Sequence, residues 1–459
     1  MTDFASLLQP DRGQSARTIT LVAPDTFDAW LGRQSVATRA LATAQRFTGK
    51  SGTHLLFPQD DGIAVVAGVG DAASPWALAK LAETLPEGSY RLDGAEVGAN
   101  ALGWLLGQYR FTCYRNAEDQ GPRILLTRDV AHRDEMIRLA AATAQVRDLV
   151  NTGAGDLGPA ELEAEAEALA RTHHAQVTVT SGDALARDYP MIHAVGQAAT
   201  RERAPRLIEL HWGDPTHPRI AIVGKGVCFD TGGLDIKPSS GMRLMKKDMG
   251  GAAHALALAS LVMAARLPVR LHLLIPAVEN AVSAASFRPG DVLKTRKGLT
   301  VENTNTDAEG RLILGDALTR AGEESPELIL DFATLTGAAR VALGPDLPPL
   351  FTDDEALATD LLAAAAAEDD PVWRMPLWDG YDDMLKSDIA DMVNAPDGGF
   401  AGAITAALFL RRFVPKDTAW AHLDVFAWRP SGKPGRPKGG DAYALRAAYR
   451  MLKGRYSRG

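Results

Sequence analysis

The sequence predicts an α/β fold in two domains, a smaller N-terminal layered α/β domain and a larger C-terminal α/β domain. Three observations support this prediction. The length of 459 residues allows two or three domains at roughly 150 residues each. Short apolar or β-branched runs alternate with helical patterns, as in layered α/β proteins. A long helix-like stretch at residues 129–150 separates two regions of this kind.

The first region, residues 1–128, is predicted to be the N-terminal α/β domain. Its strand-like runs lie at residues 18–22, 54–57, 63–66 and 124–126, and a helical pattern covers residues 28–44. No combination of residues in this region points to catalysis. We therefore expect the chemistry to lie in the other domain.

Residues 129–151 are predicted to form a linking helix, and residues 152–459 the larger domain. Buried-strand patterns occur at residues 219–224, 270–275 and 327–332, with helical patterns at 251–266 and 314–321. Ligand sites in open α/β sheets gather at the carboxyl ends of strands. The unusual residues of this chain follow these strand patterns directly.

Composition excludes several classes of protein. The net charge of −8 argues against a nucleic acid or an anionic membrane as the main partner. Cys113 and Cys228 are too few for a disulfide framework, and neither lies in a Cys-x-x-Cys pair that could bind metal. The first residues lack a signal-peptide pattern, and the longest apolar stretch, residues 252–265, is too short to span a bilayer. We expect a soluble, cytoplasmic protein.

Charged residues and glycines follow the strand pattern at 219–224. Lys225 and Asp230 come first, and Lys237 and Asp248 follow. Taken singly, such residues are more often surface ion-pair partners, and glycine-rich stretches are common turns. A phosphate-binding loop is excluded, because Gly226 follows Lys225 where that motif requires Ser or Thr.

The pair Asp307 and Glu309 is more informative. In an extended segment, side chains two residues apart point to the same side, so both carboxylates would reach one cation. An exposed acidic turn is the alternative, but the apolar run at residues 312–314 follows closely. Buried carboxylates repel each other unless a cation pairs them. Their oxygen ligands suit magnesium or manganese, and zinc also accepts carboxylates.

Several motifs, in order and spacing, closely resemble the leucyl (cytosol) aminopeptidase family. The most specific is NTDAEGRL at residues 305–312. The others are VGKG at 223–226, DTGG at 230–233, Lys237-Pro238, DMGGAA at 248–253, ATLTGA at 333–338, SDIAD at 387–391 and WAHLD at 420–424. The resemblance covers residues from about 148 to the C-terminus, whereas the N-terminal region matches only loosely.

The resemblance implies a metallo-aminopeptidase whose catalytic domain has a central mixed sheet flanked by helices. It also implies two divalent metal ions, manganese or zinc with magnesium as a third candidate. Asp230 and Glu309 would contact both ions, Lys225 and Asp248 would complete one site, and Asp307 would serve the other. Lys225 must be uncharged to bind metal, which requires a strongly lowered pKa.

The resemblance assigns the remaining roles as well. Lys237 would stabilise the oxyanion, and Arg311 would hold a bicarbonate-like anion that shuttles protons. The substrates would be peptides with a free N-terminus, and the protein would be a homohexamer. Five further residues would line the substrate site: Met245, Asn305, Thr334, Leu335 and Gly337.

Two segments depart from the family pattern. Lys246 and Lys247 precede Asp248 where a small residue is common, and large aromatic residues occur at 425–430 where many relatives have Ala and Gly. A leucine preference therefore does not carry over with the chemistry. The alternatives are a narrow-range dipeptidase, another metal hydrolase, or a peptidase with a secondary DNA-binding role.

Overall fold

The computed structural model describes residues 2–59, 62–70, 74–115 and 121–457. It divides into two compact units. The smaller unit comprises Met1–Ala144 and Arg429–Lys438, and the larger comprises Gln145–Trp428 and Gly439–Gly459. The predicted boundaries after residues 128 and 151 stay a prediction. The division between the units falls inside α6 (Val130–Asn151), a helix in the stretch predicted as the linking helix.

The smaller unit contains a six-stranded sheet of order β1-β6-β5-β2-β4-β3. All neighbouring strands are parallel except β3 and β4. Its strands are β1 (Leu8–Pro10), β2 (Arg17–Val22), β3 (His54–Gln59), β4 (Gly62–Gly68), β5 (Gly88–Leu92) and β6 (Arg123–Thr127). Its helices before α6 are α1 (Phe4–Leu7), α2 (Phe27–Gly32), α3 (Val36–Ala44), α4 (Ala79–Thr84) and α5 (Asn100–Leu106). The four predicted strands and the layered α/β class are confirmed.

The single helix predicted at residues 28–44 is wrong. The segment forms two helices, because α2 ends at Gly32 and the hydroxyl of Ser35 accepts a hydrogen bond from the Thr38 amide at the start of α3. A serine at this position satisfies one of the amides that a helix N-terminus leaves without a partner. The apolar spacing continues across the break, which is why the sequence pattern concealed it.

The larger unit is built on a nine-stranded mixed sheet. Its main order is β16-β15-β18-β14-β9-β11-β8-β7, with β10 also paired to β11. These strands are β7 (Gln176–Ser181), β8 (Arg206–Trp212), β9 (Arg219–Gly224), β10 (Gly226–Asp230), β11 (Arg270–Asn280), β14 (Leu328–Ala333), β15 (Pro349–Phe351), β16 (Trp373–Arg374) and β18 (Ala419–Asp424). Smaller sheets use β12 (Val292–Lys294), β13 (Thr300–Glu302) and β17 (Met392–Val393), and β19 (Trp428–Arg429) with β20 (Gly439–Gly440).

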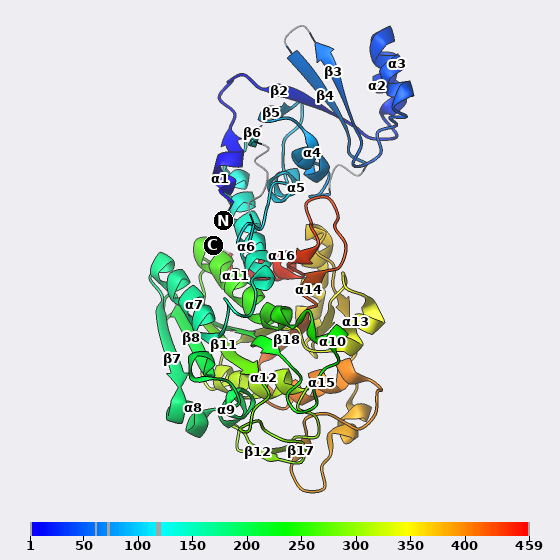
Figure 1. The fold of residues 1–459 in the computed structure, drawn as a ribbon. Coiled ribbons are helices and arrows are strands. Elements are labelled where there is room, and N and C mark those ends of the chain that lie inside the picture. Colours follow the sequence, from blue (N-terminus) through cyan, green and yellow to red (C-terminus); the bar gives the residue numbers. More distant parts are fainter. Residues whose placement is uncertain (1, 60–61, 71–73, 116–120, 458–459) are drawn as a thin grey trace. The chain divides into compact units, whose positions relative to one another are not determined.

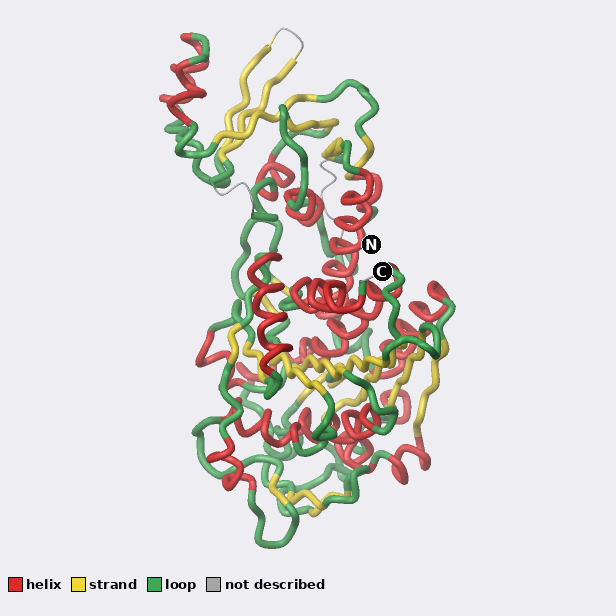
Figure 2. The backbone as a smooth tube through the Cα atoms, turned by 180° about the vertical axis from the view of Figure 1, so that it is seen from behind, coloured by secondary structure: helices red, strands yellow, loops and turns green. Residues whose placement is uncertain are grey.

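Helices cover both faces of this sheet, as the fold class predicts (Figures 1 and 2). The helices of this part of the chain are α7 (Pro159–His173), α8 (Gly182–Asp188), α9 (Pro190–Gly196), α10 (Ser239–Met242), α11 (Gly250–Ala264), α12 (Glu309–Gly322), α13 (Gly337–Leu343), α14 (Glu355–Glu368), α15 (Gly402–Arg411) and α16 (Leu445–Tyr456). Short 3-10 helices are η1 (Arg201–Arg203), η2 (Met245–Met249) and η3 (Asp379–Leu385). In Figure 1, α11 and α16 lie on one side of the sheet and α12 and α15 on the other.

The middle of the sheet is parallel, and this arrangement positions the site. β9 pairs in parallel with both β11 and β14, and β14 pairs in parallel with β18. Their carboxyl ends therefore meet at one edge of the sheet. The antiparallel pairs, β8 with β11 and β15 with β18, lie further out. A strand buried on both faces needs apolar residues throughout, and β14 is buried along its whole length.

Glycine is required where α11 crosses the sheet. A Cβ atom on Gly251 would lie 2.1 Å from the carbonyl oxygen of Phe332 and 2.8 Å from the amide nitrogen of Lys225. These two backbone groups form the hydrogen bond that follows β9, at 3.0 Å. The close approach of helix and strands thus depends on the absence of a side chain at this position.

We predict that Gly251→Ala lowers the free energy of unfolding by about 1–3 kcal/mol, because the added methyl group overpacks the helix–sheet contact. Urea unfolding followed by tryptophan fluorescence measures the change. Gly155→Ala is the matched control, since a Cβ there meets nothing within 4 Å. Equal stability of the two variants would contradict the prediction.

Candidate metal centre and substrate cavity

Three of the predicted site residues lie at the carboxyl ends of central strands. Lys225 follows β9, Asp230 is the last residue of β10, and Thr334 follows β14. Gly232 and Gly233 adopt positive φ angles of 88° and 66°, so the chain turns sharply after Asp230. The amide of Gly232 then donates a hydrogen bond of 2.8 Å to Asp230 Oδ1, which fixes the carboxylate.

Two further carboxylates come from helix starts. Asp248 lies on η2, directly before α11, and Glu309 is the first residue of α12. The extended conformation predicted for Asp307 and Glu309 is therefore wrong. Asp307 lies in a turn, and Ala308 is the N-cap residue of α12. The two carboxylates converge because the turn leads into the helix, and the helix N-terminus favours negative charge.

Lys225 lies between two of these carboxylates. Its Nζ is 2.7 Å from Asp248 Oδ2 and 2.9 Å from Glu309 Oε1, and it donates to the Thr334 carbonyl at 3.1 Å. Gly310 makes room for this side chain, because a Cβ there would lie 2.7 Å from Lys225 Nζ. Burial alone would lower the pKa of Lys225, but the carboxylates of Asp248 and Glu309 outweigh burial and raise it.

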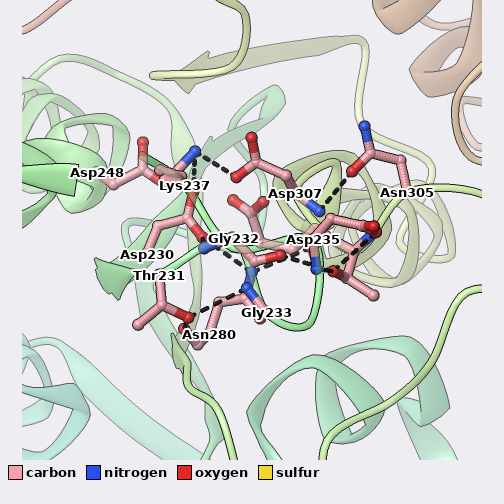
Figure 3. A network of polar contacts seen from close by, with 12 residues as sticks. Asp230, Thr231, Gly232, Gly233, Asp235, Lys237, Asp248, Asn280, Asn305 and Asp307 are labelled. Carbon is pink, nitrogen blue, oxygen red and sulfur yellow. Dashed lines mark hydrogen bonds and ion pairs between the residues drawn. The ribbon is translucent and has the colours of Figure 1, made fainter. Parts of the chain in front are cut away.

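Lys237 pairs with the other two carboxylates of the cluster. Figure 3 shows its Nζ between Asp230 and Asp307, 2.9 Å from Asp230 Oδ2 and in ion-pair contact with Asp307 Oδ1. Asn280, at the end of β11, donates 2.8 Å to Asp230 Oδ1 and 3.1 Å to the carbonyl of Thr306. It thus joins the strand edge to the loop that carries Asp307.

The carboxylate cluster is short of hydrogen-bond donors. Asp248 Oδ2, Asp307 Oδ1 and Glu309 Oε1 are buried, and among the described residues their partners are the ammonium groups of Lys225 and Lys237. Burial and the charge of Asp230 raise the pKa of Glu309 to about 8 and that of Asp307 to about 6. Ligand atoms of Asp230, Asp307 and Glu309 lie within 4.8 Å of one another, a spacing that fits a bound cation.

Arg311 extends from the first turn of α12 toward the same region. Its Nη1 donates 2.7 Å to the carbonyl of Asn394, whereas its Nε is buried and finds no hydrogen-bond partner among the described residues. Burial lowers its pKa to about 10, so the guanidinium stays charged at neutral pH. A buried guanidinium edge without a partner is suited to binding an anion.

One cavity of about 470 Å³ is lined by every residue that the sequence assigned to the site. The cavity is lined by the predicted metal residues, by the predicted catalytic residues and by the predicted substrate residues. These are Lys225, Asp230, Lys237, Met245, Asp248, Asn305, Asp307, Glu309, Arg311, Thr334, Leu335 and Gly337.

The same cavity is lined by residues outside the predicted site set, of which Lys247 and Phe426 fall in the two segments that depart from the family pattern. Among these residues are Lys247, Arg340 and Phe426. Asn280, which the sequence also left unassigned, donates a hydrogen bond to Asp230. Burial lowers the pKa of Lys247 to about 8, so its ammonium form still dominates at pH 7. The predicted strand at 270–275 is longer than expected and ends at Asn280, so the strand-end rule would have found this residue.

A second group of possible metal ligands lies elsewhere on the central sheet. Glu209, His211 and His272 come from β8 and β11, and the two imidazole rings stack at 4.1 Å. However, Glu209 Oε2 already lies 2.9 Å from both His272 Nε2 and Arg320 Nε. The guanidinium compensates this carboxylate, so the ion-pair network accounts for the group without a metal.

Comparison with known proteins identifies the family. Residues 144–449 match the model of the cytosol aminopeptidase family catalytic domain, and residues 18–127 match that of the M17 aminopeptidase N-terminal domain. The chain belongs to the cytosol aminopeptidase family. It is therefore a hydrolase of the aminopeptidase class, acting on peptides.

Cytosol aminopeptidases resemble this chain in both sequence and structure. A probable cytosol aminopeptidase of Syntrophotalea carbinolica is 41% identical over 76% of this chain and 73% of its own length. The crystal structure of the cytosol aminopeptidase of Coxiella burnetii has a TM-score of 0.94 and 45% identity, covering 98% of this chain and 100% of that one. The bottromycin maturation enzyme BotP in complex with Mn has a TM-score of 0.86 and 32% identity, covering 98% and 99%.

The two-domain architecture of the cytosol aminopeptidases agrees with the fold class predicted from the sequence. In the part of the chain that is described, no helix combines the length and the apolar character needed to cross a membrane. The family match to residues 18–127 also covers the N-terminal region, where the sequence resemblance is loose.

We predict that a divalent cation displaces protons when it binds to the metal-free protein. Glu309, with its pKa raised to about 8, and Lys225, whose pKa is also raised, are mainly protonated at pH 7. Cation binding favours their deprotonated forms, so affinity should rise between pH 6 and pH 8. Calorimetric titration with manganese in two buffers of different ionisation enthalpy measures the protons released. Identical enthalpies in both buffers, with affinity independent of pH, would exclude this account.

Proposed function

We propose that the chain is a dinuclear metallo-aminopeptidase that releases N-terminal amino acids from peptides, with the cavity as its active site. The observation that carries the proposal is the convergence of Asp230, Asp307 and Glu309, whose ligand atoms lie within 4.8 Å of one another. Buried oxygens of Asp307 and Glu309, paired with lysine ammonium groups, add to it. Membership of the cytosol aminopeptidase family supplies the reaction class.

Two divalent cations would share this cluster. Asp230 and Glu309 would contact both, Lys225 and Asp248 would complete one site, and Asp307 would complete the other. The ion pairs of Lys225 with Asp248 and Glu309 place its nitrogen among the same oxygens. Next to divalent cations the neutral amine is favoured, because a cation repels an ammonium group, and Lys225 then becomes a ligand.

Manganese or zinc are the proposed ions, with magnesium as a third candidate. Carboxylate oxygens suit manganese and magnesium, whereas a lysine nitrogen and carboxylates together are also acceptable to zinc. The complex of BotP with Mn, a protein 32% identical to this chain, supports manganese.

The cations would supply an activated water nucleophile and polarise the scissile carbonyl group. Lys237, whose pKa is raised although burial opposes it, stays charged and would donate a hydrogen bond to the carbonyl oxygen as negative charge develops there. Arg311 would hold a bicarbonate-like anion at its unpaired Nε, as the proton carrier between water and leaving amine.

The substrate would enter with its free α-amine directed at the metal ion that Lys225 and Asp248 would hold. Residues around this position would contact the peptide. They are Met245, Asn305, Thr334, Leu335 and Gly337, all of which line the cavity. Binding through the amine limits cleavage to the first peptide bond, which distinguishes an aminopeptidase from a general metal hydrolase or a phosphoesterase.

A homohexamer and a cytoplasmic location belong to the same proposal, and both rest on the family resemblance. A narrow-range dipeptidase and a secondary DNA-binding role are the alternatives. The net charge of −8 weighs against DNA binding as the main role.

We predict that the enzyme cleaves an aminoacyl 4-nitroanilide but not its N-acetylated form, because acetylation removes the amine that binds the cation. Activity should disappear after chelation and return with manganese or zinc. The assay uses metal-stripped protein with each ion restored separately. Equal cleavage of both anilides would contradict the aminopeptidase register, and no activity with any ion would contradict the function itself.

We predict that Lys237→Met lowers kcat about 10²–10³-fold with a smaller change in KM, since its ammonium group acts on charge that develops in the transition state. Steady-state kinetics with a leucyl anilide measure both constants. Lys386→Met is the control, because that side chain is exposed and pairs only with Asp383 among the described residues. A change confined to KM would instead indicate a binding role for Lys237.

A further inference from the structure

We propose that the cavity selects peptides whose N-terminal residue has an acidic side chain, with Lys247 and Arg340 as the residues that bind its carboxylate. This inference rests on the proposed aminopeptidase function and specifies its substrate class. It is carried by a buried lysine with a single, long ion-pair contact among the described residues, by a second cation near the same aromatic ring, and by the position of both in the cavity.

Lys247 is a buried lysine with a single, long ion-pair contact among the described residues. The residue is only 4% exposed, and its side chain lines the cavity. Among the described residues its Nζ forms no hydrogen bond, and its single ion-pair contact, with Asp248 Oδ1, is as long as 3.8 Å. Burying an ammonium group is unfavourable unless an anion compensates it. A carboxylate that enters the cavity would supply this compensation.

Arg340 adds a second positive charge at the same place. The Nζ of Lys247 lies 5.1 Å from the centre of the Phe426 ring, and the Cζ of Arg340 lies 4.7 Å from it. All three side chains line the cavity. The guanidinium also lies near Gly337, since a Cβ built on Gly337 would be 3.7 Å from Arg340 Nη2. An arginine fork and an ammonium group together are well suited to a carboxylate.

The neighbouring carboxylates are engaged with other groups. Asp424 Oδ1 accepts from the amides of Leu335 and Thr336, at 2.9 and 3.3 Å, and its Oδ2 accepts from the Thr336 hydroxyl at 2.6 Å. Asp248 Oδ1 accepts from Thr334 at 2.8 Å, and its Oδ2 pairs with Lys225 at 2.7 Å. Only Asp248 also forms an ion pair with Lys247, at a distance of 3.8 Å, and both carboxylates keep shorter contacts with other groups.

The position of Lys247 favours a side-chain carboxylate over the C-terminal carboxylate of a dipeptide. Lys247 is next in the chain to Asp248, which pairs with Lys225 on the side proposed to bind the free α-amine. The group nearest to that amine in a bound peptide is the side chain of the first residue. The C-terminal carboxylate would lie beyond the scissile bond.

The test compares glutamyl, glutaminyl and leucyl 4-nitroanilides with the manganese-loaded enzyme. These anilides have no C-terminal carboxylate, so any preference for glutamyl over glutaminyl arises from the side chain. We expect kcat/KM for the glutamyl anilide to exceed that for its neutral isostere at least about tenfold. Lys247→Met should bring this ratio to about one, and Arg340→Met should lower it.

Arg340 is exposed, so its replacement tests the proposal even if the buried Lys247 variant does not fold. Lys246→Met is the matched control, because Lys246 Nζ donates 2.5 Å to the Asn151 carbonyl and lies over the Trp428 ring. Its ratio should equal that of the parent enzyme. Cleavage of the leucyl anilide without a glutamyl preference, or a preference that survives both substitutions, would overturn the proposal. Failure to cleave any anilide would instead contradict the proposed function.

Discussion

The crowding of four carboxylates at one edge of the central sheet is the constraint on which the catalytic unit depends. Asp230, Asp248, Asp307 and Glu309 repel one another, and burial strengthens this repulsion because water no longer screens it. Two lysine ammonium groups, one on each side, compensate part of the charge. The pKa of Glu309 nevertheless rises to about 8, which means that its carboxylate remains short of positive charge.

The surrounding fold holds these groups in place against their repulsion. Parallel strands bring Lys225, Asp230 and Thr334 to one edge, and two helix starts deliver Asp248 and Glu309 to it. Two glycines make this close packing possible. Gly251 lets α11 approach the strands, and Gly310 leaves room for the side chain of Lys225. The positions of the charged side chains therefore depend on the packing of the sheet and its helices, and a substitution that alters this packing also moves the charges.

The predictions of secondary structure succeeded where the apolar pattern of a segment alone determines its conformation. The strands at β2, β9 and β14 and the long helix α6 follow from apolar runs. The twelve site residues taken from the family motifs line one cavity, and their roles stay a prediction. The predictions failed where conformation depends on contacts beyond the pattern. The helix expected at residues 28–44 breaks at a serine cap, and the carboxylates of Asp307 and Glu309 meet through a turn into α12. Asn280 escaped notice because β11 extends further than its apolar run.

The sequence by itself determined the family and the reaction class, and it named twelve residues that line the cavity, because the identity and spacing of motifs can be read along the chain. Only the tertiary structure decided which of these residues face one another. It paired Lys225 with Asp248 and Glu309, and Lys237 with Asp230 and Asp307. It also brought Lys247 and Arg340, 93 residues apart in sequence, to the ring of Phe426. Charge interactions depend on distance in space, and that distance is set by the packing of helices and strands.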